Sequence, residues 1–419
     1  GPAKVAVLAS ALMGMMNGSA IANVAATGTI TIPLMKRAGY KKEFAGAVEA
    51  AASTGGQFCP PIMGAVGFVM AEFLNLSYTQ VMLAAIVPAG LYYLGLLLAG
   101  HLEAKRLGLS GLSKEHIPDA LEVLRERGHL IIPLAVLIGL MLLGYTPLYA
   151  AVAAIAATVA ASWLRRDTRM TWDKLMAACA EGARSAVQVG VCCIIIGVII
   201  GTVTLTSLGL NLGYLILSAV EHTNLYVTGL LVMVLSTVLG MGVPGVAAYV
   251  IVQAVAVPVL LEVEVLPICA HMFCLIYACL SNITPPVAMS SYVAAGIAGS
   301  NQTKTGLLSV RLGLVGFLIP FFFLDNPILL IGADTTATLA GSLWAFFTAS
   351  VGTVALVGGL EGWFVRRSNW LERAVLVAVA PLMLYPGSLT DVVGFAILAA
   401  ATLFQWFTRC PASPQPGNA

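Results

Sequence analysis

Two apolar segments of this sequence are each interrupted by a proline pair that follows small and polar residues. The interruptions are Ser53-Thr54-Gly55-Gly56-Gln57-Phe58-Cys59-Pro60-Pro61 and Ala278-Cys279-Leu280-Ser281-Asn282-Ile283-Thr284-Pro285-Pro286. Two consecutive prolines remove backbone donors and clash with the preceding turn, so they break a helix and free backbone carbonyls. Within a bilayer such a break is tolerated only where protein or a water-filled cavity covers it. Two broken helices in corresponding positions are typical of a transporter binding site at the bilayer midplane.

The composition places these breaks in a membrane protein. Hydrophobic residues make up 59% of the chain and charged residues 10%, whereas about 25% of the residues of soluble domains are charged. The sequence therefore predicts an all-α polytopic membrane protein surrounded by lipid. It contains no G-x-x-x-x-G-K-[ST] loop for ATP, and no set of nucleophile, base and metal ligands. We expect neither an ATP-driven pump nor an enzyme, and no organic cofactor or nucleic-acid partner.

Each interruption is preceded by two apolar arms that are too short to cross a bilayer, which takes about 20 residues. The first pair meets at Asn17-Gly18, and the second pair meets over Gly240-Met241-Gly242-Val243-Pro244-Gly245. These arms predict two re-entrant hairpins over residues 5–34 and 225–261. Polar residues on the return arm of the first hairpin, such as Asn23 and Thr27, are expected to face protein or a cavity.

The order hairpin, broken helix, straight helix occurs twice. A shift of 226 residues places Gly14 on Gly240, and a shift of 225 places Pro60 on Pro285. This near-constant offset predicts an internal duplication. The expected units are repeat one (1–100), connecting and scaffold helices (101–220), repeat two (221–330), and C-terminal transmembrane helices with a tail (331–419).

The basic residues predict how the chain is oriented. When crossings are counted along the chain, all 21 Lys and Arg residues fall on one side, which the positive-inside rule assigns to the cytoplasm. The first hairpin then enters from the cytoplasm and the second from outside. The two repeats are therefore predicted to be inverted, as in many secondary transporters. Charge alone does not separate a hairpin from two full crossings, so the hairpin assignment depends on arm length.

The breaks offer oxygen ligands for a coupling cation. A hard cation such as sodium can be bound by unwound backbone carbonyls and by side-chain oxygens. We expect Na⁺ as the coupling ion, with H⁺ as the alternative. The candidate metal ligands are Asn17, Gly18, Ser19, Gly55, Gly56, Pro60, Gly242, Val243, Gly245, Ser281, Asn282 and Pro285.

Helix N-termini at the breaks present free N–H groups that suit a carboxylate. The candidate substrate-binding residues are Asn23, Thr27, Thr54, Gln57, Asn282 and Thr284. The alternative is that the proline pairs only kink helices for packing. Glu49, eight residues before Gln57, could relay a proton or complete a cation site, but its place near a membrane end favours a carboxylate in the interface.

Several of these motifs resemble one family of membrane proteins. Met13-Gly14-Met15-Met16-Asn17-Gly18-Ser19-Ala20-Ile21-Ala22-Asn23-Val24, followed by Thr27-Gly28-Thr29 and Ile32-Pro33-Leu34-Met35, resembles the large membrane subunit of tripartite ATP-independent periplasmic (TRAP) transporters. Ala47-Val48-Glu49-Ala50-Ala51-Ala52-Ser53-Thr54-Gly55-Gly56-Gln57, with Pro60-Pro61 and Met70-Ala71-Glu72-Phe73, resembles the TAXI branch. The resemblance is dense over 1–100, recurs over 238–299 and is weaker elsewhere. Phe58 and Cys59 depart from it, because bulkier aliphatic residues are common there.

The resemblance implies an elevator-type secondary transporter of a bacterial or archaeal cytoplasmic membrane. The hairpins and broken helices would form a mobile transport domain, and the other helices a scaffold. A periplasmic binding protein would deliver an organic acid such as a dicarboxylate, and a sodium or proton gradient would drive symport. A small membrane subunit, fused or separate, is a further expected partner, and the chain is expected to be part of a longer fused permease.

Two other functions are compatible with the same residues. The first is a sodium/dicarboxylate carrier that has the inverted hairpins but needs no binding protein. The second is an uncoupled channel or an assembly subunit.

Overall fold

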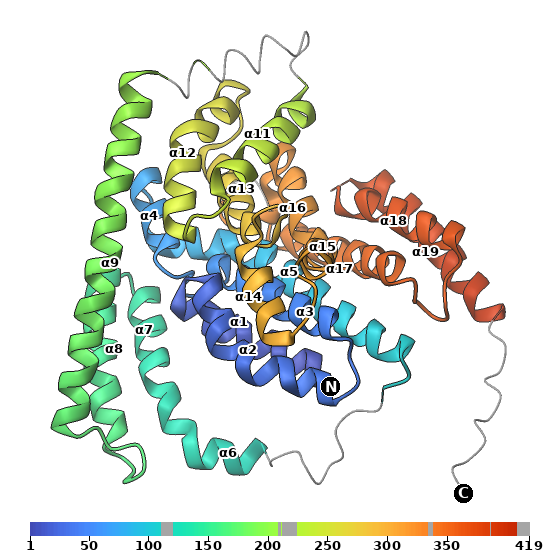
Figure 1. Ribbon diagram of the computed structural model, residues 1–419. Helices are drawn as coiled ribbons and strands as arrows, with labels where there is room; N and C mark the ends of the chain where they lie inside the picture. The colour runs from blue at the N-terminus through green and yellow to red at the C-terminus, as the bar shows by residue number, and fades with distance from the viewer. Residues whose placement is uncertain (110–119, 208–210, 212–223, 334–337, 386, 409–419) are drawn as a thin grey trace, which may run out of the picture.

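The computed structural model describes residues 1–109, 120–207, 211, 224–333, 338–385 and 387–408, which form helices joined by turns (Figure 1). Parts of the predicted units 101–220, 221–330 and 331–419 lie outside these residues. Five described helices are long and apolar enough to cross a membrane: Tyr78–Arg106, Gly245–Glu262, Gln302–Asp325, Ala340–Glu361 and Leu389–Phe407. The prediction of an all-α polytopic membrane protein is confirmed.

The first hairpin and the first broken helix form where the sequence predicts them. The elements are α1 (Pro2–Asn17), α2 (Ala20–Arg37), α3 (Lys42–Gly55), η1 (Gly56–Phe58), α4 (Val66–Leu74) and α5 (Tyr78–Arg106). Gly18 ends α1 with a φ of +66°, a left-handed conformation that glycine adopts without steric cost. The Ser19 hydroxyl then accepts a hydrogen bond from the Ala22 N–H at 3.3 Å, which caps the start of α2.

The second half repeats this plan. Its elements are α11 (Leu225–Gly240), α12 (Gly245–Glu262), α13 (Pro267–Leu280), η4 (Ser281–Ile283), α14 (Met289–Ala298), α15 (Gln302–Leu312) and α16 (Leu314–Asp325). In both halves a single 3-10 turn follows the longer arm of the broken helix, and a cis proline pair follows that turn. The predicted duplication therefore extends to the backbone of the two breaks.

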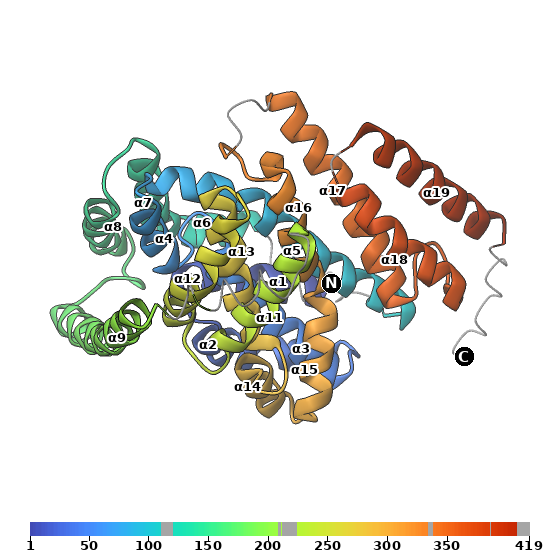
Figure 2. The same ribbon diagram turned by 90° about the horizontal axis from the view of Figure 1, so that it is seen from above.

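The remaining helices flank the two repeats. The elements on one side are α6 (Ala120–Arg127), η3 (Gly128–Ile131), α7 (Ile132–Leu142), α8 (Pro147–Ser162) and α9 (Trp172–Leu205). The elements after α16 are η5 (Pro327–Leu329), α17 (Leu339–Glu361), α18 (Trp370–Leu384) and α19 (Ser388–Phe407). In Figures 1 and 2, α9 and α19 lie at opposite edges and the hairpins lie between them. Other helices therefore flank the hairpins along this direction, while outward-facing residues such as Ile30 of α2 and Val238 of α11 are exposed.

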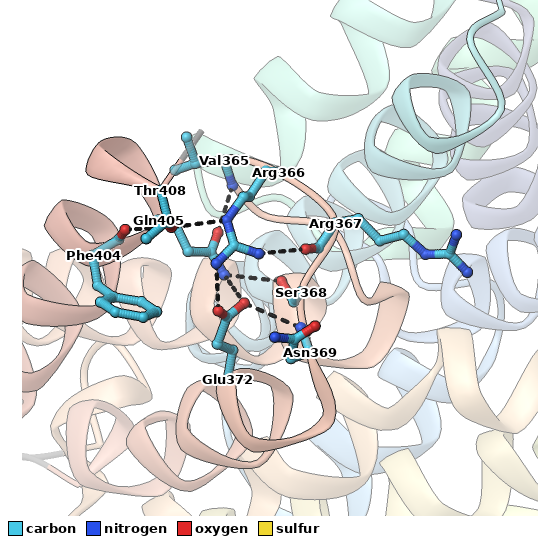
Figure 3. A network of polar contacts seen from close by, with 9 residues as sticks. All are labelled: Val365, Arg366, Arg367, Ser368, Asn369, Glu372, Phe404, Gln405 and Thr408. Carbon is cyan, nitrogen blue, oxygen red and sulfur yellow. Dashed lines mark hydrogen bonds and ion pairs between the residues drawn. The ribbon is translucent and has the colours of Figure 1, made fainter. Parts of the chain in front are cut away.

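A polar network fixes the last helices to one another (Figure 3). Arg366 pairs with Glu372 at 2.7 Å, and the Gln405 amide nitrogen of α19 donates to the other carboxylate oxygen of Glu372 at 2.9 Å. The Gln405 carbonyl oxygen accepts from the Val365 N–H at 3.1 Å. The turn before α18 is therefore joined to the end of α19.

Basic residues of the first repeat bind the C-terminal end of α14 in the second repeat. The Lys36 ammonium donates to the Ala298 carbonyl at 2.8 Å, and the Lys42 ammonium donates to the Gly299 carbonyl at 3.0 Å. These carbonyls end α14, where positive charge is favourable. Arg311 of α15 forms an ion pair with Glu361 of α17.

Candidate functional site

Gln57 lies where the two repeats meet. Its Nε2 donates to the Gly18 carbonyl, at the tip of the first hairpin, at 3.2 Å. Its Oε1 accepts from Asn282 Nδ2, at the second break, at a distance of 3.5 Å. A Cβ atom on Gly245, at the tip of the second hairpin, would lie only 2.2 Å from Gln57 Nε2. One buried amide therefore contacts both hairpin tips and the opposite break.

Paired glycines allow the first hairpin to approach the first break this closely. A Cβ atom on Gly56 would lie 2.5 Å from Gly14 Cα, and one on Gly64 would lie 2.4 Å from Gly18 Cα. The Gly64 N–H donates to the Met15 carbonyl at 2.9 Å. Gly14 and Gly64 were not predicted to have this role, although glycine is the residue that allows two backbones to approach so closely.

Two tyrosines of α5 hold the arm that leads into the first break. The hydroxyls of Tyr92 and Tyr93 donate to the carbonyls of Ala51 and Ala52, each at 2.8 Å. The Tyr92 ring also packs on Gly55, where a Cβ atom would lie 2.5 Å from it. Neither tyrosine was predicted from the sequence to contact the break, although the hydroxyls of buried tyrosines in an apolar helix need hydrogen-bond partners.

Hydroxyls predicted at the breaks bind carbonyls of their own helix. Thr54 donates to Ala50 at 2.8 Å and Thr284 donates to Leu280 at 2.9 Å, while Ser281 donates to the Ala278 carbonyl at 2.7 Å. Such bonds orient a hydroxyl and leave its lone pairs available as acceptors. Groups of three or more His, Cys, Asp or Glu side chains that could hold a metal are absent from the described residues. The donor set near the breaks therefore consists of carbonyl, amide and hydroxyl oxygens, which fits a hard cation.

The other predicted ligands lie on or beside the same two tips and breaks. Asn17, at the first tip, and Gly242, at the second, are exposed, whereas Val243, Pro60 and Pro285 are half-buried. The structure therefore places the predicted cation ligands around one junction. Their role as ligands stays a prediction.

Asn23 and Thr27 lie in a different cluster, around Glu49. Glu49 has an exposed fraction of 0%, so the expectation of a carboxylate in the interface is wrong. The reason is that the hairpin formed by α1 and α2 packs on α3 and buries Glu49 within the protein. Ser10 and Thr27 donate to Glu49 Oε1 at 2.5 Å, and the Asn23 amide nitrogen donates to the Ser10 carbonyl at 2.8 Å.

A cavity of about 480 Å³ lies elsewhere, between the α4–α5 turn and the α7–α8 turn. Its lining includes Phe68, Glu72, Tyr78, Met141 and Tyr145, and it includes none of the break residues named above. We therefore place the candidate site at the junction of the tips and not in this cavity.

Two hairpin-and-break units that meet at one polar junction are typical of a multi-pass membrane transport protein. Residues 1–338 match the family described as "Tripartite ATP-independent periplasmic transporter, DctM component". The chain therefore belongs to this TRAP large-permease family, as its motifs predicted. It is an inner-membrane transport component, and its relatives are permeases and not enzymes.

Three relatives show how much of the chain is shared. The isethionate TRAP transporter permease protein DctMQ of Oleidesulfovibrio alaskensis is 25% identical over 73% of this chain and 47% of its own length. The 2,3-diketo-L-gulonate large permease protein YiaN of Escherichia coli is 25% identical over 78% of this chain and 76% of its own length. The C4-dicarboxylate large permease protein DctM of Pseudomonas aeruginosa is 26% identical over 77% and 74%. The chain thus spans about half of the DctMQ relative and about three quarters of the others.

Proposed function

We propose that this chain is the permease unit of a TAXI-type TRAP transporter that imports an organic acid by alternating access. The observation that carries this proposal is the junction at Gln57, where both hairpin tips and the second break meet. A binding site made by two inverted units is accessible from either side if the pair moves as one body. In this elevator-type mechanism α1–α4 and α11–α14 would move against the remaining helices.

The substrate class follows from the chemistry of the junction and from the relatives. Amide and hydroxyl groups with free helix N–H groups suit a carboxylate. The relatives are named for isethionate, 2,3-diketo-L-gulonate and C4-dicarboxylates, which are all organic anions. An inward cation gradient would drive uptake of such an anion against the membrane potential. The carbonyl oxygens at the two tips are the proposed ligands when that cation is Na⁺.

The partners follow from the family. A periplasmic binding protein would deliver the acid to the outer face, and a small membrane subunit would complete the scaffold. The exposed apolar residues of α9, such as Ile194 and Val198, suit contact with lipid or with such a subunit.

The test is uptake of labelled succinate, malate and 2-oxoglutarate into proteoliposomes that hold the full-length permease, its small subunit and its binding protein. We expect uptake that requires the binding protein and an inward sodium or proton gradient. Gln57→Ala should reduce this uptake about tenfold, which corresponds to about 1.4 kcal/mol. Thr158→Ala, which removes an exposed hydroxyl of α8, is the matched control and should leave it unchanged.

Two results would contradict the proposal. Uptake that needs no binding protein would favour the sodium/dicarboxylate carrier. Flux that ignores every gradient would favour a channel.

A further inference from the structure

Glu49 is a buried carboxylate surrounded by hydroxyl groups. Oε1 accepts from Ser10 and Thr27 at 2.5 Å and from Ser53 at 3.3 Å, and Oε2 accepts from Thr31 at 2.5 Å. These hydroxyls come from α1, α2 and α3, so the carboxyl group joins both arms of the first hairpin to the broken helix. Glu49 Cγ lies so close to α2 that a Cβ atom on Gly28 would be 3.2 Å from it.

No basic side chain neutralises Glu49 among the described residues. The four ion pairs found there involve Glu103, Glu181, Glu361 and Glu372. A buried carboxylate without a counter-charge is strongly disfavoured, so such a group is neutralised by a proton or by a bound cation.

The charged and titratable groups of the surrounding helices are engaged elsewhere or lie at the surface. Tyr93 of α5 lies within electrostatic reach of Glu49, but its hydroxyl donates to Ala52. On α14, Tyr292 donates to Pro286, and on α13, His271 bonds Tyr249. The basic groups of the remaining neighbours are bound to other partners (Lys36, Lys42, Arg106, Arg311) or exposed at helix ends (Lys4, Arg37, Lys304).

Short hydrogen bonds surround the carboxyl group. Glu49 Oε1 lies 2.5 Å from the hydroxyl oxygens of Ser10 and Thr27, and Oε2 lies 2.5 Å from that of Thr31. A separation of about 2.5–2.7 Å is typical of a strong hydrogen bond between a hydroxyl and a carboxyl oxygen.

The hydroxyls can serve both protonation states. A hydroxyl is both donor and acceptor, and three of these hydroxyls have a second partner. Thr27 can donate to the Asn23 carbonyl at 2.8 Å and Thr31 to the Thr27 carbonyl at 3.0 Å, while the Ser10 and Thr27 hydroxyls lie 3.1 Å apart. When the carboxyl group is ionised, all four hydroxyls donate to it. When it is protonated, some turn to the second partner and one accepts the carboxyl proton.

We infer that Glu49 is a proton-binding site of the moving unit, which takes up a proton from the outer face and releases it to the cytoplasm during import. This inference rests on the proposed function and names its coupling ion. The site is linked to the substrate junction because α3 runs from Glu49 through Ser53 to the break. The Ser53 carbonyl also lies against Gly14, where a Cβ atom would be 3.3 Å from it. Loss of the proton changes how α1 and α2 are held on α3, and so how the first tip meets Gln57.

The first experiment detects the proton without any substrate. Infrared difference spectra of the full-length protein, recorded as the pH is raised, should show a carboxylic-acid carbonyl band that disappears. Glu49→Gln should abolish this band, whereas Cys274→Ala, at the corresponding position of the second repeat, should retain it. A titrating band that is unchanged in Glu49→Gln, or no such band in the wild type, would overturn the inference.

A second variant covers the case in which Glu49→Gln does not fold. Thr31→Val keeps the side-chain volume and removes the hydrogen bond to Oε2, so the band should move to higher frequency. An unmoved band in a folded Thr31→Val protein would show that the titrating carboxyl group is not Glu49.

The transport experiment uses the same proteoliposomes and the labelled acids named above. We expect an inward proton gradient, with the acidic side outside, to stimulate wild-type uptake about tenfold. This stimulation should be lost in Glu49→Gln and kept in Cys274→Ala. Stimulation that persists in Glu49→Gln would overturn the inference while leaving the proposed function intact. If the wild type shows no binding-protein-dependent uptake, the proposed function fails, and the infrared result still decides whether Glu49 binds a proton.

Discussion

The two hairpin-and-break units have the same backbone plan and different interiors. Ser10 and Ser236 occupy corresponding positions on the first arm of each hairpin, but Ser10 bonds Glu49 at 2.5 Å whereas Ser236 faces the Cys274 thiol at 3.9 Å. The shift that places Pro60 on Pro285 also places Asn23, Thr27 and Thr31 on Ala248, Val252 and Ala256. The duplication therefore retained the geometry of the break, while among the described residues of the two units a carboxyl group is buried only in the first.

The two units also differ in how each hairpin contacts its break. In the first unit the break touches the hairpin through backbone, because Gly56 packs directly on Gly14. In the second unit the corresponding contact involves a side chain as well as backbone, since a Cβ atom on Gly240 would lie 2.8 Å from Ser281 Oγ and 3.1 Å from the Ala278 carbonyl oxygen. We therefore expect an added side chain at this contact to destabilise the protein more in the first unit than in the second.

The largest expected effect comes from this glycine contact. Gly56→Ala drives a Cβ atom into the Gly14 backbone and should lower the free energy of unfolding by about 3 kcal/mol. Gly240→Ala should cost less, about 2 kcal/mol, because the Ser281 side chain can rotate away and only the milder contact with the Ala278 backbone remains. Thermal unfolding in detergent measures both. Equal losses would mean that the two contacts are equally rigid.

Removing the paired serines tests the difference in the interiors. Ser10→Ala takes a hydrogen bond from a buried carboxyl group and should cost about 2 kcal/mol, and Ser236→Ala should cost about 0.5 kcal/mol or less because its partner is a thiol. The same unfolding measurement applies. The comparison breaks down if Ser236→Ala proves the more costly change.

A smaller effect is expected on transport when either amide side chain of the junction, Gln57 or Asn282, is removed. Gln57 contacts the first tip and Asn282, so Gln57→Ala should reduce uptake about tenfold, while Asn282→Ala leaves the bond to Gly18 and should reduce it about threefold. Binding-protein-dependent uptake at equal permease density measures both. A larger loss for Asn282→Ala would place the dominant contact at the second break.

The smallest effect concerns the lysines that join the repeats. Lys36→Met removes a cation from the C-terminal end of α14 and should lower the free energy of unfolding by about 0.5 kcal/mol, and the difference should shrink at high salt. The exposed Lys41 is the control, and Lys41→Met should have no effect. A salt-independent loss would indicate that the Lys36 stem stabilises by packing instead of by charge.

Much of the fold could be predicted, because apolar length and proline position act locally. The hairpin tips at Gly18 and Gly242 and both proline breaks lie where the sequence placed them. Gln57 and Asn282 were both predicted to bind substrate, and each stands three residues before its proline pair. The structure places their amide groups 3.5 Å apart. The roles of Tyr92 and Gly64 were missed, because their partners lie on other elements of the chain.

By itself, the sequence determined that the chain is a helical membrane protein with two broken helices, since hydropathy and proline act over a few residues. Only the tertiary structure decided where Glu49 lies. Its surroundings depend on how the hairpin of α1 and α2 covers α3, and Ser10 is 39 residues away along the chain. Burial is a property of packing between distant segments, so a carboxylate that local pattern assigned to the membrane interface lies in the interior, surrounded by hydroxyl groups.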